Sequence, residues 1–74
     1  LDEKTKIFKH LVDKLKDKPY IIENAYLKEN NLYIECSSAE ETEALRYEER
    51  NIKKILSKIN VVPDKIRFRT TVGN

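Results

Sequence analysis

Apolar residues recur near the start of the chain at the spacing of one helix face. The positions that share this face are Ile7, Phe8, Leu11, Val12 and Leu15. This i, i+1, i+4, i+5, i+8 pattern predicts an amphipathic helix over residues 5–16. Pro19 follows it, and a proline moves the residue before it out of the helical region. We therefore expect the first helix to end before Pro19.

Two segments with the character of β-strands come next. Residues 20–28 are rich in β-branched and aromatic side chains, and residues 32–37 alternate between apolar and polar positions. Leu32, Ile34 and Cys36 share one side of the second segment. The intervening residues 29–31 contain Asn, which tolerates positive φ in turns. The pattern predicts a hairpin that packs one face of its sheet against the core.

A second helical region begins after this hairpin. Ser38 and Glu41 have capping-box spacing, and Ser37 and Glu40 offer the same spacing one residue earlier. The buried stripe would consist of Ala44, Leu45, Ile52, Ile55, Leu56 and Ile59. Residues 47–51 interrupt the stripe. We expect one long helix here, or two helices with a break near Asn51.

The last part of the chain predicts a loop and a third strand. Pro63 prevents the helix from continuing, and residues 65–71 alternate, with Ile66 and Phe68 on the inward side. The order is α-β-β-α-β, and the crossover makes the third strand parallel to the second. We predict an α+β fold with a three-stranded mixed sheet in strand order 2-1-3 and helices on one face.

Length and composition limit the chain to one domain. Its 74 residues are 39% hydrophobic and 38% charged. The chain begins at Leu1 and contains no Met, so we expect a single domain over residues 1–74 that is a piece of a longer protein. No apolar run approaches the roughly 20 residues that a membrane span needs, and no signal peptide is visible. We expect a cytoplasmic protein with no membrane partner.

No arrangement of residues predicts catalysis, a metal site or a cofactor. Cys36 falls on an inward strand face, where a free cysteine acts as a small hydrophobe. One cysteine and one histidine, His10, cannot complete a closed zinc site. Helix capping accounts for Ser37 and Ser38. The acidic residues at the start of the second helix, Glu40, Glu41 and Glu43, complement the helix dipole. We therefore expect a protein that is not an enzyme.

Charge is distributed unevenly along the chain. The net charge is +2, but residues 19–51 carry −5 and residues 52–74 carry +5. Lys65, Arg67 and Arg69 occupy alternate strand positions and form a line of charge about 13 Å long. Phosphates can follow such a line, and Tyr26 and Tyr33 would add stacking surface if they point the same way.

The residues that we predict to bind nucleic acid are Lys65, Arg67, Arg69, Lys53, Lys54, Lys58 and Tyr33. A different interpretation stays open for the strand cations. They would pair across strands with Glu35 and Glu23 and protect a sheet edge by charge. The three lysines would then be charges near a helix end, which complement the helix dipole.

The element order also matches the type II K-homology arrangement, which usually binds single-stranded nucleic acid. That mode depends on a GxxG loop between two helices, where bare backbone approaches the phosphates. The chain has one glycine, Gly73, and the corresponding turn near residues 48–51 is acidic. We expect a K-homology-like fold without the GxxG clamp.

Four segments, taken in order, resemble the DciA family of bacterial proteins. They are residues 31–38 (NLYIECSS), 43–46 (EALR), 55–60 (ILSKIN) and 66–69 (IRFR). The family shows a strand "G/N-x-L-x-V-x-V-x-S-S", a helix with "x-x-L-R", a helix end "I-L-x-x-[IL]-N" and a closing "I-x-x-I-R-F-R". The resemblance covers about residues 20–70. The sequence departs from the family at Glu41, where a Trp is usual.

This resemblance implies a K-homology-like domain that binds DNA and associates with the replicative helicase DnaB, in whose loading the family is implicated. We therefore expect a non-enzymatic replication accessory domain. Its partners would be the helicase and single-stranded or forked DNA, bound weakly by this segment. Arg67 and Arg69 match the closing motif, and Arg46 matches the helix motif as a candidate partner contact. The alternative is a protein-interaction module with no nucleic-acid role, which the missing GxxG and the acidic middle third favour.

Overall fold

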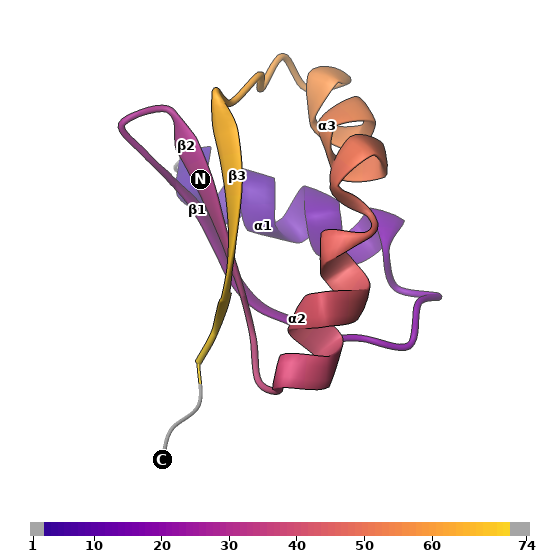
Figure 1. Cartoon of the computed structure of the whole chain (residues 1–74). Helices are drawn as coiled ribbons and strands as arrows, with labels where there is room; N and C mark the ends of the chain where they lie inside the picture. Colours follow the sequence, from indigo (N-terminus) through magenta and orange to yellow (C-terminus); the bar gives the residue numbers. More distant parts are fainter. Residues whose placement is uncertain (1–2, 72–74) are drawn as a thin grey trace.

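Three strands and three helices form two layers, with all the helices on one face of the sheet (Figure 1). The computed structural model describes residues 3–71. The elements are α1 (Glu3–Lys14), β1 (Ile22–Lys28), β2 (Asn31–Cys36), α2 (Ala39–Arg46), α3 (Glu49–Ser57) and β3 (Lys65–Thr70). The predicted α+β class, the mixed three-stranded sheet and the one-sided helices are confirmed.

A two-residue turn joins β1 and β2. Glu29 and Asn30 adopt φ values of 53° and 62°, and two positive φ angles give a turn whose twist matches that of paired strands. The pairing of Leu27 with Leu32 across the ladder places apolar residues on the same face. The register shifts between Ile22 and Asn24, so the ladder is irregular at the start of β1. β1 therefore begins two residues later than the predicted strand.

The strand order is β1-β2-β3, so the predicted order 2-1-3 is wrong. β3 does run parallel to β2, as predicted, but it also lies directly beside it. The loop before β3 is fastened to the hairpin turn, because the N–H of Asp64 donates to the carbonyl of Asn30 at 2.8 Å. The β1 edge is less suited to pairing with β3, because the register shift near Ile22 disrupts the regular spacing of the backbone hydrogen-bonding groups of β1.

The second helical region is two helices, and the break lies earlier than the predicted position near Asn51. It falls at Tyr47 and Glu48, inside the stretch that interrupts the apolar stripe. Tyr47 is 84% exposed, so no buried side chain holds this stretch against the sheet. Asn51 lies in the first turns of α3, and its side-chain amide donates to the Glu48 carboxylate at 3.2 Å.

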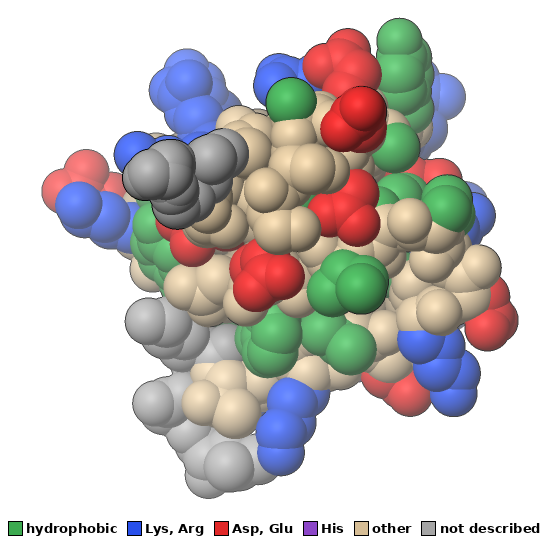
Figure 2. Space-filling model, turned by 90° about the horizontal axis from the view of Figure 1, so that it is seen from below, with side chains coloured by type: hydrophobic (Ala, Val, Ile, Leu, Met, Phe, Trp, Pro, Cys, Tyr) green, Lys and Arg blue, Asp and Glu red, His purple; other side chains and the backbone are tan. Residues whose placement is uncertain are grey.

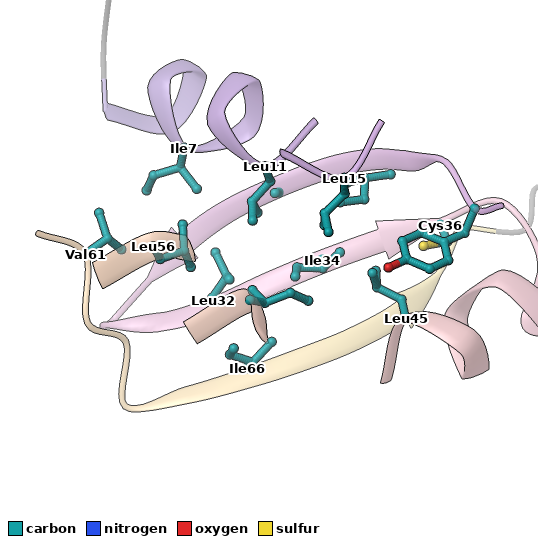
Figure 3. Packing of buried hydrophobic residues seen from close by; sticks show 14 residues of the cluster. Ile7, Leu11, Leu15, Leu32, Ile34, Cys36, Leu45, Leu56, Val61 and Ile66 are labelled. Atoms are coloured by element: carbon teal, nitrogen blue, oxygen red, sulfur yellow. The ribbon is translucent and has the colours of Figure 1, made fainter. Parts of the chain in front are cut away.

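The core lies between the sheet and the helices (Figure 3). Side chains from all six helices and strands contribute to it; the fully buried ones include Ile7, Leu11, Leu32, Ile34, Leu45, Ile52 and Leu56. Cys36 is 1% exposed, as predicted for an inward strand position. Val12, which we predicted on the buried face of the first helix, is 40% exposed. It lies at the rim of that face, where it lines a surface depression together with Ile21.

Replacing Leu56 with Ala should lower the free energy of unfolding by about 2–5 kcal/mol, because it deletes a fully buried side chain and leaves a cavity. Urea unfolding followed by circular dichroism measures this change. Val62→Ala is the control, since Val62 is 73% exposed and its truncation should change stability by no more than about 0.5 kcal/mol. Equal losses in the two variants would contradict the observed burial.

Candidate nucleic-acid interface

The face of the sheet opposite the helices carries three parallel rows of outward-facing side chains. The ladder places Lys28, Asn31 and Lys65 in one row, Tyr26, Tyr33 and Arg67 in the next, and Asn24, Glu35 and Arg69 in the third. We call this surface the open face. Successive side chains of a strand alternate between its two faces, so these residues point away from the core. The open face thus combines tyrosines, amides and cations.

A stack of three flat groups crosses the open face. The rings of Tyr26 and Tyr33 lie 5.3 Å apart between centroids and 17° from parallel. The guanidinium carbon of Arg69 lies 5.7 Å from the centroid of the Tyr33 ring, within the range of a cation–π contact. The sequence left open whether the two tyrosines share a face, and the register between β1 and β2 answers that they do.

The cations of β3 do not form the cross-strand ion pairs that one interpretation of the sequence proposed. Among the side chains that the structure describes, residues 5–71, no carboxylate oxygen lies within 4.0 Å of a side-chain nitrogen of Lys65, Arg67 or Arg69. Glu35 instead accepts long hydrogen bonds of 3.5 Å from the Tyr26 hydroxyl and from the amide of Asn24. Three exposed cations therefore line one strand without a neutralising partner in the described part of the chain.

The predicted lysines of α3 lie in the other layer. Lys53 and Lys54 are exposed on a helix whose apolar side packs towards the sheet, and Lys58 is exposed at its C-cap, so the core separates all three from the open face (Figure 1). Lys53 also pairs with Glu49 at 3.7 Å. The structure therefore brings together Tyr33 and the β3 cations, and it does not bring the α3 lysines to the same surface.

Arg46, the predicted partner contact, lies at the end of α2 beside β3. Its guanidinium carbon is 5.8 Å from the centroid of the Phe68 ring, and its Nε is 3.8 Å from the Glu43 carboxylate. The side chain is about half exposed, at 54%. Arg46 thus covers the half-buried Phe68 and still presents its charge to solvent near the edge of the sheet.

The end of the molecule at the bottom of Figure 1 differs from the open face in charge. Viewed from that side, acidic side chains lie near the middle of the surface and most Lys and Arg side chains lie around its outline (Figure 2). Glu40 and Glu41 occupy the first turn of α2, as the dipole argument predicts. Acidic groups therefore gather at this helix start, away from Lys65 and Arg67.

Sequence reasoning missed part of the open face. Asn24, Lys28 and Asn31 lie in its rows, but no sequence pattern distinguishes them. The alternation of side chains along each strand identifies these residues only when the register between the strands is known. The irregularity between Ile22 and Asn24 shifts the alternation of β1 by one residue, which hides the signal in the sequence.

The other candidate residues have structural roles. Ser38 caps α2, because its hydroxyl accepts from the N–H of Glu41 at 3.1 Å. The Ser37 hydroxyl instead donates to the Glu41 carboxylate at 3.0 Å. Of the two capping alternatives, Ser38 is therefore the N-cap. His10 is half-buried, and its Nε2 lies 3.1 Å from the carbonyl of Ile55. Burial raises the pKa of the Cys36 thiol, with the Glu41 charge adding to the shift.

Within residues 3–71, no three His, Cys, Asp or Glu side chains are grouped so that they could hold a metal ion. No helix in this part of the chain is long and apolar enough to cross a membrane. A mostly apolar depression of about 250 Å³ lies between the end of α1 and the start of β1, lined in part by Val12, Leu15, Tyr20 and Ile21.

Tyr20 is the buried titratable group nearest this depression. Its side chain is 6% exposed overall, and its hydroxyl has no hydrogen-bond partner among the described residues. Burial raises the pKa of Tyr20 to about 12, and the charges of Glu48 and Cys36 add to the shift. A neutral phenol is therefore favoured in the folded state well into the alkaline range.

The folded protein should lose stability as the pH rises from about 10 to about 12, because unfolded Tyr20 releases its proton at the lower pKa and folded Tyr20 at the higher one. The unfolded state binds fewer protons in this window, so alkali favours unfolding. Urea unfolding at several alkaline pH values measures the loss. Tyr20→Phe lacks the hydroxyl and should lose less stability over the window. The same loss in both proteins would contradict this assignment.

Comparison of the chain with models of known protein families, with curated protein sequences and with solved structures finds no match. Of the described surfaces, the open face combines a row of cations with aromatic rings. It is accordingly the candidate site.

Proposed function

We propose that this chain is a non-enzymatic accessory domain of DNA replication, similar to the DciA family, that binds DNA on the open face of its sheet. The observation that carries the proposal is the exposed row of Lys65, Arg67 and Arg69 beside the tyrosine stack, with no carboxylate pairing the cations in residues 5–71. Cations that lack an internal partner are available to phosphates, whose neutralisation releases bound counterions and favours association.

The tyrosine stack supports single-stranded DNA as the preferred form. Unpaired bases stack on aromatic side chains and on guanidinium planes, and such contacts tolerate any sequence. Tyr33 and Arg69 provide both kinds of surface within one stack. In duplex DNA the base faces are covered by their neighbours, so the stack would add nothing there. We therefore place phosphates along β3 and bases towards Tyr33.

The K-homology-like character of the fold is part of the proposal. The order α-β-β-α-α-β includes a pair of helices joined by a short turn, as the type II arrangement requires. The turn at Tyr47 and Glu48 contains no glycine, and Glu48 carries a negative charge. Phosphates are repelled by such a turn, so the usual clamp would not form. The open face of the sheet is the alternative surface.

The replicative helicase enters the proposal through the resemblance of the sequence segments. Arg46 belongs to the matching helix motif, and its guanidinium is half exposed at the end of α2. A helicase contact at α2 would leave the open face accessible to DNA, because α2 lies on the other side of the sheet (Figure 1). The domain would then hold both partners at once.

Replacing both Arg67 and Arg69 with Glu should weaken binding to fluorescent single-stranded DNA and should reduce the slope of log K against log salt by about 2, about 1 for each lost phosphate contact. Anisotropy titrations at several salt concentrations, with single-stranded and forked DNA, measure both effects. Circular dichroism and urea unfolding confirm that the variant is folded.

The matched control is Lys53→Glu with Lys54→Glu, which makes the same change in net charge on α3. This control should retain most of the affinity and the salt slope. Equal losses in the two double variants would show that only overall charge matters, and would overturn the placement of DNA on the open face. Absence of binding by the wild-type domain at low salt would favour the alternative, a protein-interaction module.

Tyr33→Leu should weaken single-stranded DNA binding several-fold, because it removes a stacking surface and the ring that holds Arg69, while binding to duplex DNA should change little. The same anisotropy assay compares the two DNA forms. Tyr47→Leu is the control, since Tyr47 is exposed at the turn between α2 and α3. A larger loss in Tyr47→Leu than in Tyr33→Leu would move the site to that turn.

A further inference from the structure

β3 lies at the edge of the sheet with one side of its backbone unpaired by a strand. The order β1-β2-β3 gives β3 a neighbour on its β2 side alone. The N–H of Thr71 donates to the carbonyl of Cys36 on that side at 2.7 Å, and backbone groups alternate between the two edges of a strand. The N–H and carbonyl groups of Lys65, Arg67 and Arg69 therefore face β2, and those of Ile66, Phe68 and Thr70 face the free edge. In Figure 1 no ribbon passes in front of β3.

This edge lacks the devices that usually prevent strand addition. β3 pairs with β2 over six residues in unbroken register, and it contains no proline and no bulge. The opposite edge of the sheet differs, since the register of β1 shifts between Ile22 and Asn24. Bulges and prolines at edges block pairing with further chains. β3 is therefore the edge at which another strand can add with regular hydrogen bonds.

The charges of β3 select the kind of strand that fits. Lys65, Arg67 and Arg69 are exposed on one side of the strand, and a residue directly opposite on an added strand lies about 5 Å away. A second copy of β3 would place cations opposite cations, which is unfavourable. Acidic residues at alternate positions would complement the row instead.

The other side of the same edge is apolar. Ile66 is 9% exposed, Phe68 is half-buried, and Arg46 lies over the Phe68 ring. Residues of an added strand that point to this side would contact Phe68 and the aliphatic part of Arg46. Apolar residues therefore suit the positions between the acidic ones.

We propose that the free edge of β3 binds an extended segment of another protein, in which acidic and apolar residues alternate, as a fourth strand of the sheet. Main-chain hydrogen bonds would supply affinity, and the alternating side chains would supply specificity. This interface does not depend on the proposed DNA binding, but it uses Arg67 and Arg69. Peptide and DNA should accordingly compete for the domain.

The test uses the wild-type domain and a fluorescent peptide of alternating Glu and Val. Two further peptides carry N-methyl groups, one on every Glu and the other on every Val, with the same side chains and charge. An added strand directs the N–H groups of one set towards β3 and those of the other set towards solvent. Fluorescence anisotropy measures the affinity of each peptide at low salt.

We expect one N-methylated peptide to bind with the affinity of the parent peptide. The other should bind at least about tenfold more weakly, because its methylated nitrogens cannot donate hydrogen bonds to the β3 edge. The affected set also reports the strand direction. In a parallel strand the N–H groups of residues opposite the β3 cations face β3, and in an antiparallel strand those of the intervening residues do. Equal affinities of the two N-methylated peptides, whether high or low, would overturn the proposal.

A variant of the domain tests the same contact from the other side. Thr70→Pro and Thr70→Ala both remove the hydroxyl that lies 2.9 Å from the hydroxyl of Thr42, and Pro also removes an N–H that faces the free edge and is not part of the ladder with β2. We expect Thr70→Pro to weaken peptide binding and Thr70→Ala to retain most of it. Equal binding by the two variants, with both folded by circular dichroism, would show that charge alone attracts the peptide and would count against strand addition.

Discussion

The central position of β2 determines most of this structure. Its inward residues Leu32, Ile34 and Cys36 are at most 1% exposed, and both of its edges are paired. A strand with one buried face admits a single register, because a slip of one residue would turn its apolar side chains to solvent. The register of β2 then fixes which residues of β1 and β3 face outward. The open face, with Tyr33 and Glu35 along its middle, is a consequence of that burial.

The small size of the domain explains why its charges are separated. A chain of 74 residues buries a limited core, and 38% of its residues are charged, so most charged side chains must lie on the surface. Acidic residues lie at the start of α2, where the helix dipole stabilises them. The cations of β3 have no such internal partner in the described part of the chain. Exposing these charges to water costs little free energy, because water solvates them. The exposed charges form a surface that attracts anionic partners.

The open face and the free edge of β3 are neighbouring surfaces that share cations. A nucleic-acid strand would contact side chains across the sheet, whereas a peptide strand would contact the backbone of Ile66, Phe68 and Thr70 along the edge. Both ligands are anionic, so the same positive potential would draw them to β3. A domain that bound both ligands would exchange one anionic partner for the other without a change of fold. The α3 lysines lie on the far side of the core and would take no part in either contact.

The sequence by itself determined the existence and type of the elements, because hydrophobic periodicity and capping are local. It predicted the inward residues of β2 and β3, the cap at Ser38 and the buried Cys36, and all of these are confirmed. It also singled out the cation row of β3. Only the tertiary structure decided the strand order, the position of the helix break and the joining of Tyr26, Tyr33 and Arg69 in one stack. Strand order depends on which edge is regular and where the final loop is fastened, and these are contacts between residues distant in sequence. A row of residues across three strands exists only once the register between those strands is set.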